Sequence, residues 1–570
     1  MRTSRRVPVV AALGLVAALS AAAFAREEAV RSFDRTVALA GGRALRVTHR
    51  QGDVVIRGHA APEVRVVARI RTSAPTRAEA EELGAQIRIE VETDSLGVSV
   101  RTVYPEIGWS RRNVSFAVDY DIAMPEASPL SLRNDFGNAS VSGLHASAEI
   151  VTSHGRLVAS DLRGETRLDN KFGAVEAARI GGDLSISNGN GAVSATDVGG
   201  RLTLTNRFGD VLVRQVKKAA TISNANGKVD ASDLVGPSTV SDSFGAVTVN
   251  GVAGDLTVSA RNSRLDVRGV TGLADLTSSF DEIAASDIGG RLAITGQNGR
   301  VTATAVKGSA RVRNSFGVVS IRDVTGEVDV QNQNGAVRVQ DLASSLTIRT
   351  SFGEAEASAI KGGARIDNAN GGVVVRDVGG AVEVGNRFGR VDIRQVGQGV
   401  RVISGNGDVN VIGAGGPTFI KTSFGLSQVE RVGGLTVESA NGAVRASTVK
   451  GPADVRTSFA PVTLSGVEGA VDVRNQNGSV DVTVAPAAGA KCARIGLSTS
   501  FGAIRLGIAE NMGFNVTART SFGKIVSRVP LTTTGIVSGE SLSGTVGGGG
   551  CELALTNRNG DITIGPGAAR

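Results

Sequence analysis

The sequence contains few aromatic, histidine and cysteine residues. Among its 570 residues, aromatic residues make up 4%, with one Trp and two Tyr, beside four His and two Cys. It has no P-loop, no His-Glu-x-x-His, no Cys-x-x-Cys and no Gly-x-Ser-x-Gly motif. No apolar run of about 18 residues follows the N-terminal segment, as a transmembrane helix would require. We therefore expect a chain without catalytic, cofactor or metal sites, and with no transmembrane segment in its mature form.

The N-terminus has the pattern of a secretory signal peptide. Residues 1–6 carry three arginines, Val7–Leu19 is apolar, and residues 23–25 match a small-x-small cleavage site. We expect cleavage after Ala25, so that residues 1–25 are removed, and export to the periplasm, the cell surface or the medium. Loss of the three arginines lowers the formal net charge from +8 to +5. That charge is interleaved with acidic residues, which predicts a solvated surface and no nucleic-acid binding.

Repeats dominate the rest of the chain. Phe recurs every 36 residues from Phe136 to Phe424, and Asn occupies the halfway positions from Asn190 to Asn406. The unit is therefore 18 residues long, and one position, which we call the slot, alternates between Phe and Asn. Counted from the slot as zero, positions 3, 5, 8, 12 and 14 are mostly aliphatic, with the spacing of two that is typical of β-strands. Each unit then contains two short strands, separated by turns in which Gly recurs at positions 1 and 10.

Two arrangements of these strands are conceivable. Asn-Gly between apolar runs is typical of a β-hairpin. A hairpin array gives no reason for one inward pattern to persist through about twenty units, whereas a coil does. We therefore predict an all-β fold, a single-stranded parallel β-helix or β-solenoid, with β-rich caps at both ends. Each 18-residue unit is one rung, and equivalent residues stack about 4.8 Å apart.

Four recurring positions have a structural interpretation. Phe in every rung would crowd the slot and Asn would underfill it, so we expect alternation to fill a corner densely, and Phe316→Asn to lower the melting temperature. Asn two positions before the slot is expected to bond along a ladder or to turn backbone groups. Asp at position 7, as in Asp323, fits Asx-turn capping better than a calcium ladder, because the calcium-binding nonapeptide is absent. Gly at position 10 is expected to supply a positive φ.

Regions of a different kind flank the regular array. Residues 26–130 alternate like strands and include a predicted helix from Thr76 to Leu83, as expected of an N-terminal β-cap region. We expect a regular solenoid over residues 131–484, and irregular rungs with a C-terminal cap over residues 485–570. Caps cover solenoid ends that would otherwise be exposed sheet edges. Cys492 and Cys551 both lie in the last region, and the sequence leaves open whether they form a disulfide.

These motifs carry a resemblance to a known family. The Asn-x-Asn-Gly-x-Val-x-Val and Ser-Phe-Gly-x-Val units resemble a bacterial putative-adhesin domain family of secreted β-solenoid proteins of uncharacterised function. Residues 120–125 look like that family's opening strand, and residues 544–562 are similar to its closing segment. The long run of Phe-Gly turns departs from the commoner all-Asn-Gly pattern. The resemblance implies a parallel β-solenoid and an adhesin-like role.

The sequence favours a non-enzymatic exported rod that binds or presents partners, such as glycans or proteins, at the cell envelope. A periplasmic structural scaffold is the alternative. A polysaccharide-active β-helix enzyme is disfavoured, because residues 131–484 lack the long loops that carry such active sites. An ice-binding Thr/Ser face is disfavoured as well, since position 13 carries charges of alternating sign that suit pairing between rungs.

Candidate ligand-binding residues lie in the N-terminal region. They are Tyr104, Trp109, Arg111 and Arg112, because aromatic and arginine side chains favour contact surfaces, although a role in the core of the cap is the stronger interpretation. Among the histidines, His154 occupies a slot and is expected to be a turn residue. The other three, His49, His59 and His145, are candidate ligands, although solvated side chains are the stronger interpretation.

Overall fold

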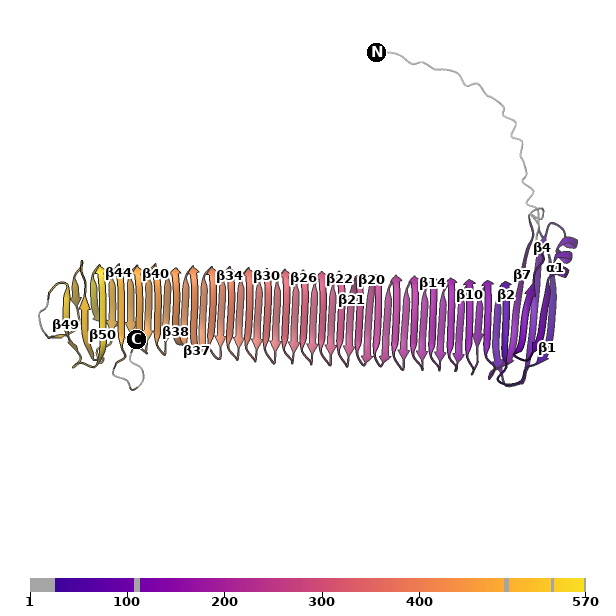
Figure 1. Cartoon of the computed structure of the whole chain (residues 1–570), viewed down its shortest axis with the longest axis horizontal. Coiled ribbons are helices and arrows are strands. Elements are labelled where there is room, and N and C mark those ends of the chain that lie inside the picture. The colour runs from indigo at the N-terminus through magenta and orange to yellow at the C-terminus, as the bar shows by residue number, and fades with distance from the viewer. Residues whose placement is uncertain (1–25, 107–112, 486–488, 490–491, 535–537, 568–570) are drawn as a thin grey trace, which may run out of the picture. The chain divides into compact units, whose positions relative to one another are not determined.

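A computed structural model of the chain describes residues 26–106, 113–485, 489, 492–534 and 538–567 (Figure 1). Strands make up 71% and helix 2% of the structure. The strands form a parallel β-solenoid of about 20 turns, with about 18 residues in each rung. The predicted fold class is therefore confirmed. The predicted signal peptide, residues 1–25, lies outside the described residues. Residues 1–164 and 165–570 are two compact parts, which we describe in turn.

The first part contains eleven of the described strands and one helix. They are β1 (Glu27–Ala38), β2 (Ala44–Gln51), β3 (Val54–His59), β4 (Glu63–Ala74), α1 (Arg77–Gln86), β5 (Arg88–Asp94), β6 (Gly97–Val103), β7 (Ser115–Pro125), β8 (Leu130–Phe136), β9 (Ala139–Ser142), β10 (Ala148–His154) and β11 (Leu157–Leu162). Strand β4 pairs antiparallel with β1 and β7, whereas β2, β8 and β10 are parallel neighbours. The cap is thus an antiparallel sheet joined to the first parallel rungs.

Helix α1 begins with a capping box. Thr76 Oγ1 accepts a hydrogen bond from the Glu79 amide, and the Glu79 carboxylate accepts one from the Thr76 amide. The helix continues to Gln86, three residues beyond the predicted end. Ala80 and Leu83 are buried, because the helix contacts β1 and β4.

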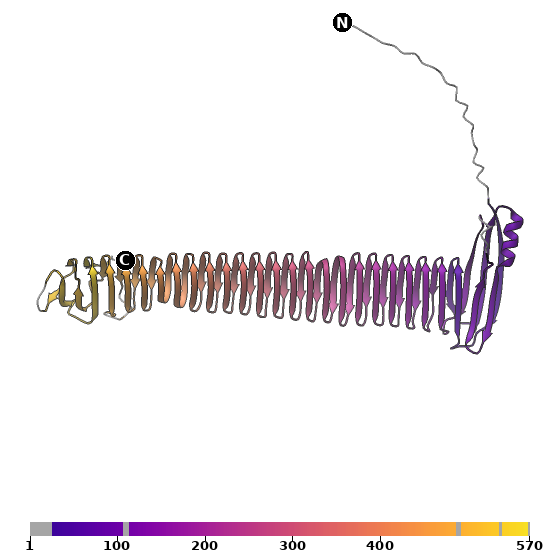
Figure 2. The same cartoon turned by 45° about the horizontal axis from the view of Figure 1, so that its top comes forward.

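Two strands form each rung of the second part (Figure 2). One set runs from position 12 to the slot: β12 (Thr166–Phe172), β14 (Leu184–Asn190), β16 (Leu202–Phe208), β18 (Ala220–Asn226), β22 (Ala274–Phe280), β24 (Leu292–Asn298), β26 (Ala310–Phe316), β28 (Val328–Asn334), β30 (Leu346–Phe352), β32 (Ala364–Asn370), β34 (Val382–Phe388), β36 (Val400–Asn406), β40 (Ala453–Phe459), β42 (Val471–Asn477) and β44 (Ile495–Phe501).

The other set begins at position 3: β13 (Val175–Ile180), β15 (Val193–Val198), β17 (Val211–Val216), β19 (Val229–Val235), β23 (Ile283–Ile288), β25 (Val301–Val306), β27 (Val319–Val324), β29 (Val337–Leu342), β31 (Ala355–Ile360), β33 (Val373–Val378), β35 (Val391–Val396), β39 (Val444–Val449), β41 (Val462–Val467), β43 (Val480–Val484) and β45 (Ile504–Ile508). In four places both strands of a rung are continuous: β20 (Ser238–Ala253), β21 (Leu256–Val270), β37 (Val409–Phe424) and β38 (Ser427–Asn441).

Equivalent positions of successive rungs stack in columns. Val312 pairs in parallel register with Val330, which pairs in turn with Ile348. All three side chains are fully buried, and positions 3, 5 and 8 are buried as well, so these five positions point inward and form the core. The parallel register excludes the hairpin arrangement.

Two turn columns require unusual backbone geometry. Gly317, directly after the slot, has a φ of +114°, and a Cβ there would lie 2.1 Å from the carbonyl oxygen of Gly299. The backbone at position 7 is also in the left-handed region, with a φ of 55° at Asp323. Asp tolerates this conformation better than most residues, which explains why it recurs there. At position 10 the expected positive φ is present at Gly236, at 98°, but absent at Gly200. There a Cβ would meet the Gly182 backbone at 2.4 Å, so close approach is the constraint.

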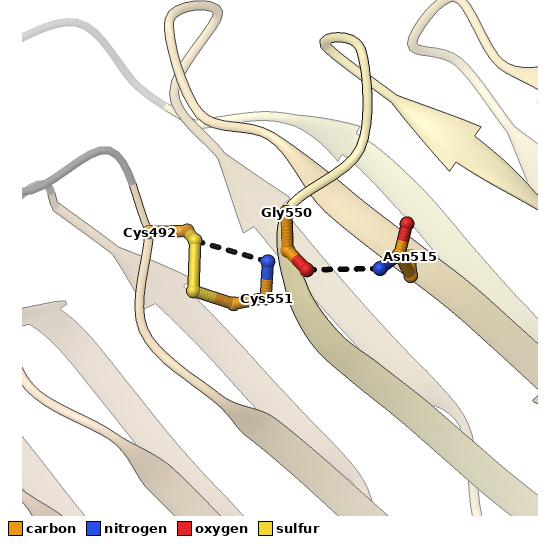
Figure 3. The surroundings of a disulfide bond; sticks show 4 residues. All are labelled: Cys492, Asn515, Gly550 and Cys551. Atoms are coloured by element: carbon orange, nitrogen blue, oxygen red, sulfur yellow. Dashed lines mark hydrogen bonds between the residues drawn. A yellow bond between two sulfur atoms is a disulfide. The ribbon is translucent and has the colours of Figure 1, made fainter.

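The C-terminal rungs do not follow chain order. They comprise β46 (Phe514–Arg519), β47 (Ile525–Ser527), β48 (Thr532–Thr533), β49 (Ser541–Val546), β50 (Cys551–Asn559) and β51 (Ile562–Pro566). Strand β50 lies between β44 and β46, parallel to both, and β49 pairs antiparallel with β46. Cys492 and Cys551 form a disulfide across the start of this inserted rung (Figure 3). The last segment of chain is therefore threaded between earlier rungs and fastened there.

Candidate functional site

The slot residues form an alternating surface column, which we call the slot column. From Phe172 to Phe501 the Phe side chains are 46–55% exposed. The prediction that these rings fill an internal corner is therefore wrong. The inward alternation of the strand ends two residues before the slot, as at Asn314, so Phe316 and the residue before it both lie outside the core.

Shorter Asn side chains alternate with the Phe rings, half-buried at most rungs and exposed at Asn190, Asn262 and Asn441. Each Asn pairs in register with a Phe on either side, as Asn334 does with Phe316 and Phe352. The amide can fold back onto the neighbouring rung, since Asn370 Nδ2 donates to the carbonyl oxygen of Ser351 at 3.4 Å. The column thus alternates protruding rings with short polar side chains, and its period is two rungs, about 9.6 Å.

One rung of the first part carries a second ring at the Asn level. His154 pairs in register with Phe136, and the two rings stack with centroids 4.7 Å apart and an interplanar angle of 10°. His154 thus occupies a slot, as predicted, and its ring stacks on the Phe ring of the preceding slot.

A long groove runs beside the slot column, along strands β24 to β42. Its volume is about 1630 Å³, and it is lined by the three residues before the slot on eleven consecutive rungs, from Thr295 to Gln476. We call it the polar groove. No loop crosses it, because the turns of these rungs carry no insertion. Its shape suits an extended polymer.

Buried amides and hydroxyls lie beneath the polar groove, because its central row of side chains points inward. Asn332 Nδ2 donates to the carbonyl oxygens of Gly317 and Gly335, at 3.0 and 3.1 Å. At other rungs Thr takes the same position, as where the Thr422 hydroxyl donates to the carbonyl oxygen of Phe424 at 2.9 Å. In the second part's earlier rungs, Asn188 Nδ2 also donates to Asn206 Oδ1 at 3.1 Å. Both predicted roles of this Asn, ladder and turn, are confirmed.

Charged side chains of both signs lie along the groove wall. Lys421 pairs with Glu438 at 3.1 Å, and Arg349 pairs with Asp329 at 3.2 Å. The predicted pairing between rungs at position 13 is also present, since Arg365 lies 2.7 Å from Glu383. Hydrogen-bonding side chains therefore recur along the groove with the rung spacing of about 4.8 Å, except at the rung of Ile403 and Gly405, on a surface of mixed charge.

The N-terminal candidate residues lie in a different environment. Tyr104 OH accepts a hydrogen bond from the Gln51 amide and lies 3.1 Å from His49 Nδ1, while its ring contacts Phe116. Tyr104 therefore belongs to the packing of the cap. Trp109, Arg111 and Arg112 lie outside the described residues.

The expectation that His49 is solvated is wrong. It is 3% exposed, and its ring meets Tyr120 edge-on at 4.9 Å. Burial lowers the pKa of His49 to about 4, so the ring is neutral at pH 7. His145, by contrast, lies 3.3 Å from the Glu126 carboxylate, and His59 Nδ1 accepts a hydrogen bond from the Ala61 amide.

The described residues hold neither a candidate metal site nor a helix that could span a membrane. These residues contain no cluster of three or more His, Cys, Asp or Glu side chains that could hold a metal ion. Nor does any helix in this portion of the chain combine the length and apolarity of a membrane span.

Comparison with known proteins gives little. No family model and no curated protein matches the chain. A solved structure, a putative cell adhesion protein from Clostridium sporogenes, matches with 12% identity over 40% of this chain and 100% of its own, at a TM-score of 0.17.

Sequence reasoning located the slot column but missed the polar groove. The signal was present, because short or polar residues recur at the position before the slot with the same 18-residue period, as in Ser315, Ser351 and Ser423. What the sequence could not provide was that these residues line a continuous groove on successive rungs.

Proposed function

We propose that this protein is an exported, non-enzymatic, adhesin-like binding rod of the cell envelope, and that the polar groove is its binding surface. The observation that carries the proposal is the uninterrupted length of the groove over eleven rungs. A surface of this kind offers the same contacts repeatedly, so a polymer gains affinity by occupying successive rungs rather than one deep pocket.

The chemistry of the groove indicates the class of ligand. Its walls carry Arg, Lys, Gln and Glu side chains, whereas the Asn and Thr side chains of its central row are buried beneath it and bonded to turn carbonyl groups. Such a surface suits hydrogen-bonding chains, either a glycan or an extended polypeptide, and has no deep apolar pocket for a small molecule. Binding through many weak polar contacts also fits a surface that stays hydrated.

Deletion of whole double repeats tests this proposal. Removal of residues 317–352 joins Phe316 to Gly353, keeps the Phe-Gly turn and removes two groove rungs. Removal of residues 173–208 joins Phe172 to Gly209 and removes two rungs that do not line the groove. Both proteins, together with the parent chain, would be screened against immobilised glycans and envelope proteins. We expect ligands of the parent to bind more weakly to the first deletion and unchanged to the second.

Equal losses in both deletions, or no ligand for the parent, would contradict a groove-based function. Labelling of intact cells with a membrane-impermeant reagent separates a surface adhesin, which is labelled, from a periplasmic scaffold, which is not.

A further inference from the structure

The slot column is a second surface, distinct from the polar groove, because no slot residue lines the groove. Ten half-exposed Phe rings, at every second rung from Phe172 to Phe501, form a single file. Each exposes about 100 Å², half of the area that an aromatic side chain can bury, which gives about 1,000 Å² in total. Stable interfaces bury about 800 Å² per partner, so the column is large enough for a protein interface.

We propose that the slot column is a self-association surface, on which a second copy of this chain docks antiparallel. In this arrangement each Phe of one copy enters the recess over an Asn of the other. The proposal goes beyond the binding function of the groove and does not depend on it.

The period of the column selects this partner. Its rings repeat every two rungs, about 9.6 Å, over roughly 90 Å. A ligand whose repeat differed by only about 1 Å would be displaced by half a period after about five repeats. A second copy has the same period by construction, so all ten rings can remain in register.

The spacing between the rings also fits a partner ring. A Phe placed at the Asn level lies about 4.8 Å from the rings above and below, within the 4.5–7 Å range of favourable aromatic pairs. A ring at the Asn level beside one slot Phe already occurs in the first part, where His154 lies 4.7 Å from Phe136. In the dimer the partner's Phe takes the corresponding place.

The residues beside the rings allow a close approach. The position before a Phe slot is Lys171, Arg207 or Arg387 on three of the ten rungs, and a short, neutral Ser on the other seven, namely Ser243, Ser279, Ser315, Ser351, Ser423, Ser458 and Ser500. The partner can therefore reach the rings without burying charge at these rungs.

Symmetry fixes the direction. A two-fold axis perpendicular to the stack, halfway between a Phe rung and an Asn rung, places every Phe opposite an Asn. A two-fold axis parallel to the stack places Phe opposite Phe and leaves the recesses empty. The antiparallel arrangement is also closed, so it ends at a dimer rather than a fibre.

Sedimentation velocity of the full chain over a concentration series tests the proposal. We expect a monomer–dimer equilibrium. Replacing three central rings, Phe316→Ser, Phe352→Ser and Phe388→Ser, is expected to weaken dimerisation at least 100-fold while leaving the circular dichroism spectrum and melting temperature nearly unchanged. A matched groove variant, Arg313→Ser with Gln331→Ser, is expected to dimerise like the parent. A monomer at all concentrations, or open-ended growth, would overturn the proposal.

Filling the recesses distinguishes interdigitated docking from non-specific association of apolar surfaces. Asn334→Phe with Asn370→Phe makes the column more apolar but occupies the places that the partner's rings need. We expect dimerisation at least 10-fold weaker, whereas a merely adhesive apolar stripe would associate more tightly. Tighter association of this variant would therefore reject the interdigitated arrangement.

Energy transfer between labelled copies tests the direction. Cysteines introduced at Ala174 and at Ser479, seventeen rungs or about 80 Å apart, would be labelled in separate preparations, since both native cysteines are in the disulfide. We expect transfer from donor at 174 to acceptor at 479, and little between copies that are both labelled at 174. The reverse result would show a parallel pair and overturn the proposal.

Discussion

Asn332 Nδ2 lies 3.0 Å from the carbonyl oxygen of Gly317, on the neighbouring rung. The same nitrogen donates to the carbonyl oxygen of Gly335 in its own turn. One buried amide thus joins two successive turns. It lies beneath the polar groove and two residues before the slot column.

Substitution of Asn332 tests this role. Asn332→Ala leaves two carbonyl oxygens without their donor, and we expect the free energy of unfolding to fall by about 1–3 kcal/mol. Asn332→Thr is the matched control, since Thr422 and Thr457 fill the same position and donate to the slot carbonyl oxygen. Urea denaturation followed by circular dichroism should show the smaller loss for Thr. Equal losses would assign the effect to packing.

The column of exposed Phe rings and the inner aliphatic column should respond differently to substitution. Val312 is fully buried, so Val312→Ala is expected to cost about 2 kcal/mol through lost packing. Phe316, four residues later, is 51% exposed, and Phe316→Ser should change the melting temperature of the monomer little. A large loss for Phe316→Ser in the monomer would mean that the ring packs against the core after all.

Ala460 occupies a position at which most rungs have Gly. Its φ is +96°, in a region that costs an L-residue about 1 kcal/mol or more. Ala460→Gly is therefore expected to raise the melting temperature, although greater chain entropy of the unfolded state offsets part of the gain. Ala336→Gly, at an ordinary backbone position, is the control and should lower it. A decrease for both variants would refute the strain at Ala460.

His49 should make the first part sensitive to acid. Its pKa is lowered from 6.5 to about 4, mainly by burial, so between these values the unfolded chain binds a proton that the folded chain does not. The contribution of His49 to the free energy of unfolding is therefore fully present above pH 6.5. It is lost as the pH decreases toward 4, which lowers the free energy of unfolding by about 3 kcal/mol. Thermal melting at pH 7.5, 6 and 5 measures this slope. His49→Gln should flatten it between pH 6.5 and 5, and an unchanged slope would exclude His49 as its source.

The disulfide should stabilise the threaded C-terminal rungs. It closes a loop of 59 residues, for which chain-entropy arguments give about 4 kcal/mol. Replacing both cysteines with Ser should therefore lower the melting temperature and increase proteolysis after residue 484. Limited proteolysis with mass spectrometry would locate the cuts, and cuts distributed evenly along the chain would contradict this role.

How much of the structure the sequence predicts depends on whether a feature repeats. The stacking of Val312 on Val330 follows from an 18-residue period in aliphatic residues, because only a coil keeps that pattern in register. The exposure of Phe316 does not follow from its residue type, because a large hydrophobic side chain is expected in the core. Its position two residues after the last inward side chain was the better indicator.

The sequence does not predict structural features that occur only once in the chain. The threading of β50 between β44 and β46 reverses the order of rungs, and no local pattern encodes it. The burial of His49 likewise depends on strands 53 to 71 residues away, which supply Thr102 and Tyr120. The groove is intermediate, since its residues recur with the period but its shape arises from the backbone.

Distances between spin labels on the slot column test the central structural claim most directly. Nitroxides would be attached to cysteines replacing Phe316 and Phe388 in one protein, four rungs apart, and Phe280 and Phe424 in another, eight rungs apart, each diluted with unlabelled chain. Pulsed electron resonance should give about 19 Å and about 38 Å, a strict doubling that follows from one rung per 18 residues. Equal distances, or a second distance well short of twice the first, would contradict the stacked solenoid and the surfaces built on it.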